Sequence, residues 1–134
     1  MSRRHRHLAT WIGDVLPRLG LRRWRVTLSE EPADADAHAQ ISPHDQSYDA
    51  ELSLDPDFLD LPLERQRELL THELLHLAFA HVDTAVEHLE PVIGTAAWSV
   101  FSPHYSDAFE RAIDELARAI APSLPLPVVT AKAA

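Results

Sequence analysis

The segment from Thr71 to His81 reads THELLHLAFAH and places three histidines and one glutamate among leucine and alanine. Asp60-Leu61-Pro62 before it has the form of a helix start, with Asp60 as the N-cap and a proline in the first turn. We therefore predict one amphipathic helix over residues 62–80. Such a helix can also carry histidines without a function on its solvent-exposed surface. Their role must therefore be inferred from the rest of the chain.

Three short runs with alternating apolar residues precede this helix, and a turn or loop is expected at residues 42–45. The runs are Trp24–Leu28, Ala35–Ile41 and Tyr48–Leu54. Because alternation is typical of half-buried strands, we predict a small three-stranded sheet, mixed or antiparallel, with at least one antiparallel pair. An amphipathic helix over residues 7–19, closed by Gly20, is predicted before the sheet.

The chain after the histidine-containing helix gives weaker signals. Thr84-x-x-Glu87 has the capping-box form and predicts a short helix. Residues 91–103 are apolar and show no clear pattern. Ser106 is expected to cap a final helix that ends near Ile120, because its apolar residues recur at helical spacing.

Length and composition predict a single α+β domain over residues 1–134, since the chain is 46% hydrophobic. Its core is expected in about residues 8–120, followed by a proline-rich tail at 121–134 that is extended or frayed. The absence of cysteine excludes disulfides and thiolate metal sites, so a metal would need histidine or carboxylate ligands. No apolar run approaches the ~20 residues of a membrane span, and we expect a cytoplasmic protein with no membrane partner.

The net charge of −9 is distributed unevenly along the chain. Residues 1–25 contain seven arginines and one acid, whereas the remaining residues contain five basic residues and twenty acids. A basic segment can indicate a nucleic-acid ligand. The acidic body would repel a phosphate backbone, so nucleic acid is disfavoured as a partner.

Residues His72 to His76 form the motif HExxH. Two side chains four positions apart on a helix point only about 40° apart, so both imidazoles can reach one ion, and zinc suits such ligands. Glu73 lies about 100° from His72, beside the metal and close to its water. Metalloproteases use this arrangement with the glutamate as general base. We therefore predict Zn²⁺ as cofactor, His72 and His76 as ligands, and Glu73 as the catalytic residue.

A catalytic zinc ion needs a third protein ligand and one open position. Glu110 lies at the border of the apolar stripe of the final predicted helix, and we expect it to be this ligand. Asp107 and Asp114 lie one turn before and after it and are alternatives, or one of them orients a ligating histidine. His81 is a further alternative, but an intact helix would turn it about 140° from His76 and place it in the core or at the helix end.

The order of these parts resembles the minimal zincins, the minigluzincin-like zinc metallopeptidase domains of phage and prophage type. The resemblance covers residues 8–120 and rests on YDAELSLDP at 48–56 and THELLHL at 71–77, while ERAIDELA at 110–117 matches by pattern. It implies a zincin-like fold in which a C-terminal helix supplies a glutamate as third ligand. It also implies hydrolysis of a peptide or protein substrate that binds in extended form beside the strand at 48–54.

The same resemblance implies that Glu73 takes a proton from the attacking water and passes it to the leaving amine. The developing oxyanion needs a donor, and His104, Tyr105 and His88 are candidates for oxyanion or substrate contacts by residue type. One alternative is a non-catalytic binding module stabilised by zinc with four protein ligands. Another is a zinc-dependent endoribonuclease, although its family motif, HxxxHLxGxDH, has a glycine and a final Asp-His that this segment lacks.

Overall fold

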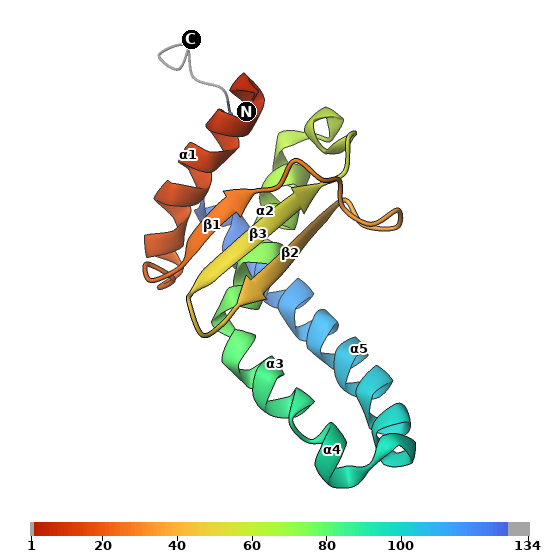
Figure 1. Ribbon diagram of the computed structural model, residues 1–134. Helices are drawn as coiled ribbons and strands as arrows, with labels where there is room; N and C mark the ends of the chain where they lie inside the picture. The colour runs from red at the N-terminus through yellow and green to blue at the C-terminus, as the bar shows by residue number, and fades with distance from the viewer. Residues whose placement is uncertain (1, 129–134) are drawn as a thin grey trace.

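The computed structural model describes residues 2–128, which form helices together with one small sheet (Figure 1). This confirms the α+β class. The elements are α1 (Arg3–Arg18), β1 (Arg25–Leu28), β2 (Ala39–His44), β3 (Asp49–Leu54), η1 (Phe58–Asp60), α2 (Leu63–Ala78), α3 (Ala80–Glu87), α4 (Glu90–Ile93), α5 (Thr95–Ile120) and η2 (Ala121–Ser123). Within the described residues, no helix is both long enough and apolar enough to cross a membrane.

The sheet has the strand order β1-β3-β2, with β1 parallel and β2 antiparallel to β3. The predicted small sheet with at least one antiparallel pair is confirmed, and of the two predicted alternatives, mixed or antiparallel, it is the mixed one. In β3, Ala50 and Leu52 are buried while Glu51 between them is exposed, so helices cover only one face. Figure 1 looks onto the open face, with α2 behind the sheet.

Two clusters of buried side chains hold the helices in place. The larger one joins the sheet to α1 and α2, and it includes Leu52, Leu70, Leu74 and Leu77. The smaller one joins α2 to α5 through Leu75, Ile113 and Ala117. Helix α2 thus packs against the sheet on one side and against α5 on another.

The second strand differs from the prediction, because it spans Ala39–His44 rather than residues 35–41. The loop expected at 42–45 is therefore wrong for its first three residues, which pair with β3. Pro43 has no N–H to donate to a neighbouring strand, and sequence reasoning takes this as a sign of a turn. At the edge of a sheet this loss is tolerated, since one side of the strand has no partner.

The helix predicted over residues 62–80 is broken near its end. Phe79 has φ −111° and ψ 9° between α2 and α3, so the two helices are separate. Asp60 lies in η1 and does not cap α2, whose N-cap position is Pro62. The capping box is also wrong, because α3 begins at Ala80 and Thr84 lies inside it.

The final helix begins at Thr95, so the prediction that Ser106 caps it is wrong. Pro103 lies within this helix and removes one backbone hydrogen bond. Four aromatic side chains at helical spacing contact one another in sequence, with ring centroids 5.6–5.9 Å apart. They are Trp98, Phe101, Tyr105 and Phe109. Together with α3 and α4, the first half of α5 forms an arm (residues 80–105) that projects from the sheet (Figure 1).

The ends of the chain depart from the prediction in the same direction, towards more structure. Helix α1 begins at Arg3 rather than residue 7, and Ser2 caps it by accepting a hydrogen bond from the backbone N–H of His5. Leu124 is buried, and the Trp11 indole donates a 2.7 Å hydrogen bond to the carbonyl of Pro125. Of the two predicted alternatives, extended or frayed, residues 124–127 follow the extended one and are held by these contacts, residues 121–123 form η2, and residues 129–134 lie outside the described part.

Candidate metal centre

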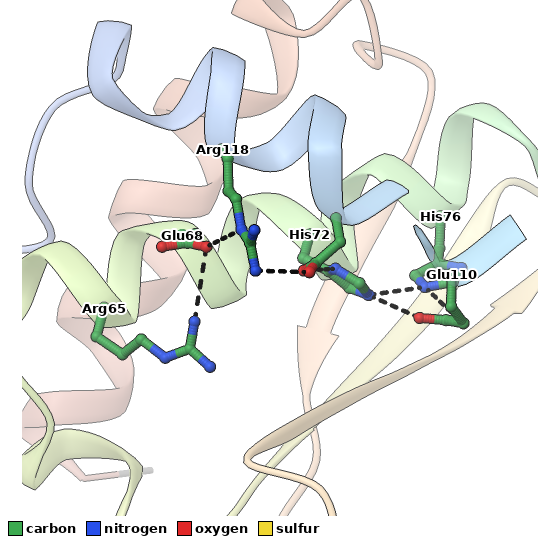
Figure 2. A network of polar contacts seen from close by, with 7 residues as sticks. Arg65, Glu68, His72, His76, Glu110 and Arg118 are labelled. Carbon is green, nitrogen blue, oxygen red and sulfur yellow. Dashed lines mark hydrogen bonds and ion pairs between the residues drawn. The ribbon is translucent and has the colours of Figure 1, made fainter. Parts of the chain in front are cut away.

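Two histidines of α2 and one glutamate of α5 bring their ligating atoms together. The Nε2 atoms of His72 and His76 lie 3.3 Å apart, and the two carboxylate oxygens of Glu110 lie 3.0 Å and 3.1 Å from these nitrogens. Figure 2 shows the three side chains pointing at one another across the two helices. This group could hold a metal ion.

The spacing of the three ligands fits a small divalent cation. In a tetrahedral zinc site with bonds of about 2.0–2.1 Å, neighbouring ligand atoms lie about 3.3 Å apart. The two nitrogens lie 3.3 Å apart, close to that value, and each lies 3.0–3.1 Å from a different oxygen of Glu110. Two imidazoles and one carboxylate also form a donor set that suits zinc. The residues present therefore fit the metal that the sequence predicts.

The position of Glu110 follows from the way α5 packs on α2. Ile113 and Ala117 are fully buried against Leu75, and they lie three and seven residues after Glu110 on the same side of α5. His72 and His76 flank Leu75 on α2. The small apolar cluster therefore turns the carboxylate of Glu110 towards the two imidazoles.

A row of charged residues continues from the metal group along both helices (Figure 2). The Oδ1 atom of Asp114 lies 3.3 Å from Nδ1 of His72, and Arg118 donates a 3.1 Å hydrogen bond to the other carboxylate oxygen of Asp114. Arg118 also lies 3.4 Å from Glu68. Asp114 thus contacts the imidazole nitrogen that faces away from Glu110, which is the position of an orienting residue.

The remaining alternatives for the third ligand lie elsewhere. Asp107 is exposed and pairs with Arg111 at 3.1 Å. His81 is exposed on α3, with Nε2 3.2 Å from the hydroxyl of Tyr48 and Nδ1 3.4 Å from Asp45. His81 is therefore not in the core; it lies at a helix end, because the break at Phe79 makes it the second residue of α3.

Glu73 lies between α2 and the edge strand β2. It lines a cavity of 280 Å³ together with His76 and with residues of β2. The pKa of Glu73 is raised to about 8: burial is the largest cause, the charge of Glu110 adds to it, and a hydrogen bond with the backbone of Ile41 opposes both effects. The strand beside the site is therefore β2, and the expectation that it is the strand at 48–54 is wrong.

Burial also affects the second histidine of the motif. It lowers the pKa of His76, and the neighbouring His72 acts in the same direction, while Glu110 and Asp83 oppose the change. A lowered pKa favours the neutral imidazole at physiological pH. Only the neutral form has a lone pair on its Nε2 atom for a metal ion.

A second cavity, of 210 Å³, lies beside the metal group between α3 and α5. Tyr105 lines this cavity, and its hydroxyl donates a 2.9 Å hydrogen bond to Asp83. Burial and the bond to Asp83 raise the pKa of Tyr105 to about 12, so this hydroxyl stays protonated. His88 and His104 are exposed and line neither cavity.

Residues of the arm around the second cavity were missed by the sequence reasoning. Asp83 and Trp98 belong to no motif, and Glu87 was assigned only to a capping box. The helical spacing of the aromatic residues in α5 was the available signal, because it indicates that the helix continues through residues 98–109. No family model matches the chain, and neither curated proteins nor solved structures give a match.

Proposed function

We propose that this protein is a zincin-like, zinc-dependent peptidase in which His72, His76 and Glu110 hold the metal. The observation that carries the proposal is the convergence of these three ligands next to the carboxylate of Glu73. The remaining side of the group faces a cavity rather than the core. An open position of this kind distinguishes catalytic from structural zinc sites.

Glu73 is the proposed general base. A zinc ion held by the three ligands would supply Lewis acidity, which polarises a carbonyl oxygen and lowers the pKa of water. Glu73 then takes the proton of the attacking water and delivers it to the leaving amine. Its raised pKa applies to the site without a cation, and a nearby positive charge lowers it, which keeps Glu73 ionised and ready to accept the proton.

The edge strand β2 is the proposed binding site for the peptide backbone. Its residues Gln40, Ile41 and Pro43 line the cavity that contains Glu73, and its outer edge has no strand partner in the described sheet. An extended peptide can add to such an edge through main-chain hydrogen bonds. This would place a peptide bond in front of the metal group.

The alternatives have less support. A zinc-stabilised binding module needs a fourth protein ligand, but among the described residues the group contains three, and His81 and His88 lie outside it. An endoribonuclease needs basic side chains for phosphate groups. Neither of the two cavities beside the metal group is lined by lysine or arginine.

The proposal is tested with three proteins: the parent, His76→Ala and Glu73→Gln. Metal analysis of the purified proteins should find about one zinc ion in the parent and in Glu73→Gln, and much less in His76→Ala. Hydrolysis of fluorescein-labelled casein should fall by at least about 100-fold in Glu73→Gln, because general-base catalysis is lost. Glu64→Gln, an exposed acid in the first turn of the same helix, is the matched control. A parent protein without zinc, or a fully active Glu73→Gln variant, would contradict the proposal.

A further inference from the structure

We propose that the cavity between α3 and α5 binds the cationic side chain of a lysine or arginine in the substrate, next to the bond that is cleaved. This inference rests on the proposed peptidase function and specifies which substrate side chain the peptidase would prefer. It is drawn from three features of the cavity: its position, its charge and its aromatic walls.

The position of the cavity connects it to the reaction site. His76, Asp83 and Glu110 line both this cavity and the one that contains Glu73, so the two spaces adjoin at the metal group. A peptide extended along β2 can therefore direct one side chain into the space between α3 and α5. The volume of 210 Å³ is below the roughly 300–1,000 Å³ typical of small-molecule sites, which suits a single side chain.

The charge of the cavity favours a cation. Apart from Glu110, which is assigned to the metal, the cavity is lined by the carboxylates of Asp83 and Glu87 and by no lysine or arginine. The hydroxyl of Tyr105 donates to one oxygen of Asp83, which fixes the orientation of that carboxylate. An acidic side chain in this space would be repelled, whereas a neutral one would leave the charges of the two carboxylates uncompensated.

The walls of the cavity suit the rest of a basic side chain. Trp98, Tyr105 and Phe109 contribute aromatic rings, and the rings of Tyr105 and Phe109 lie 5.6 Å apart. The methylene groups of lysine or arginine pack well against such faces, and a cation near the ring is attracted by its π electrons. The cavity thus combines an apolar wall for the stem with carboxylates for the charged end.

The test uses hexapeptides with blocked ends, so that a single side chain carries the only charge. One series places lysine at each position in turn, and matched series place norleucine or glutamate there. At one position we expect lysine to be cleaved about tenfold faster than norleucine, as for a hydrogen-bonded ion pair still partly open to water. Glu87→Gln should remove this ratio, and Glu87→Lys should make the glutamate peptide the better substrate. Glu90→Gln, an exposed acid on α4 that does not line the cavity, should keep the ratio.

A binding measurement separates this inference from the peptidase proposal. In zinc-loaded Glu73→Gln protein, the indole NMR signal of Trp98 should shift with the lysine peptide at lower concentration than with the norleucine peptide. If no peptide is cleaved but this preference is present and Glu87→Gln removes it, the cavity assignment stands and the peptidase proposal fails. Cleavage without a lysine preference, or a preference that Glu87→Gln leaves intact, overturns the cavity assignment alone.

Discussion

Replacing Glu73 by glutamine should change the pH dependence of folding stability in the metal-free protein. The pKa of Glu73 is raised from 4.5 to about 8, so the folded state keeps a proton that the unfolded state releases. Stability from this group is therefore complete below about pH 4.5 and is lost as the pH rises towards 8. At 1.36 kcal/mol per pH unit, the loss between pH 5.5 and pH 8 is at most about 3 kcal/mol. Glutamine does not titrate and should not show it.

The measurement is urea denaturation of both proteins in EDTA across this pH range. The stability of Glu73→Gln relative to the parent should rise by up to about 3 kcal/mol towards pH 8, while contributions from other groups, including His76, are largely shared and cancel. Glu110→Gln should reduce the effect, because the charge of Glu110 is the second cause of the raised pKa. Parallel stability curves for parent and Glu73→Gln would refute the conclusion that the buried carboxyl is neutral in the folded protein.

Three further changes test the positions of individual side chains. Asp114→Asn should weaken zinc binding about 10- to 100-fold in a chelator competition, because Asp114 contacts His72, whereas Asp107→Asn should not. Leu74→Ala should lower the free energy of unfolding by about 2–5 kcal/mol in denaturant titrations, since this side chain is fully buried. His81→Ala should leave the zinc content unchanged in metal analysis, and a loss of zinc would contradict its place outside the metal group.

Features set by neighbouring residues were predictable from the sequence. The spacing of His72 and His76 places both imidazoles on one side of a helix wherever that helix packs. The alternation of buried and exposed residues in β3 likewise follows from strand geometry, and a small three-stranded sheet with at least one antiparallel pair was predicted from such alternation. These predictions needed only the local period of each element.

Features that depend on contacts between residues far apart in the sequence were harder to predict. A turn or loop was expected at Pro43, but pairing with β3 keeps this residue in a strand. Residues 91–103 showed no clear pattern, but from Thr95 onward they belong to a continuous helix that includes Pro103. The contact between Asp114 and His72 depends on the register of α2 against α5, which burial of Ile113 and Ala117 fixes. A single sequence shows the apolar stripe of each helix but not which turn of one meets which turn of the other.

The ionisable side chains at the metal group connect metal binding with the stability of the fold. Without a cation, Glu73 is held neutral by burial and the charge of Glu110, and burial lowers the pKa of His76. Both groups would be better solvated in the unfolded chain, so their burial opposes folding. The small apolar cluster beside them favours folding. A cation bound by His72, His76 and Glu110 would offset the negative charge of Glu110 that acts on Glu73. It would bind only the folded form, in which the three ligands come together. Zinc should therefore raise the stability of the whole domain by an amount that grows with its free concentration.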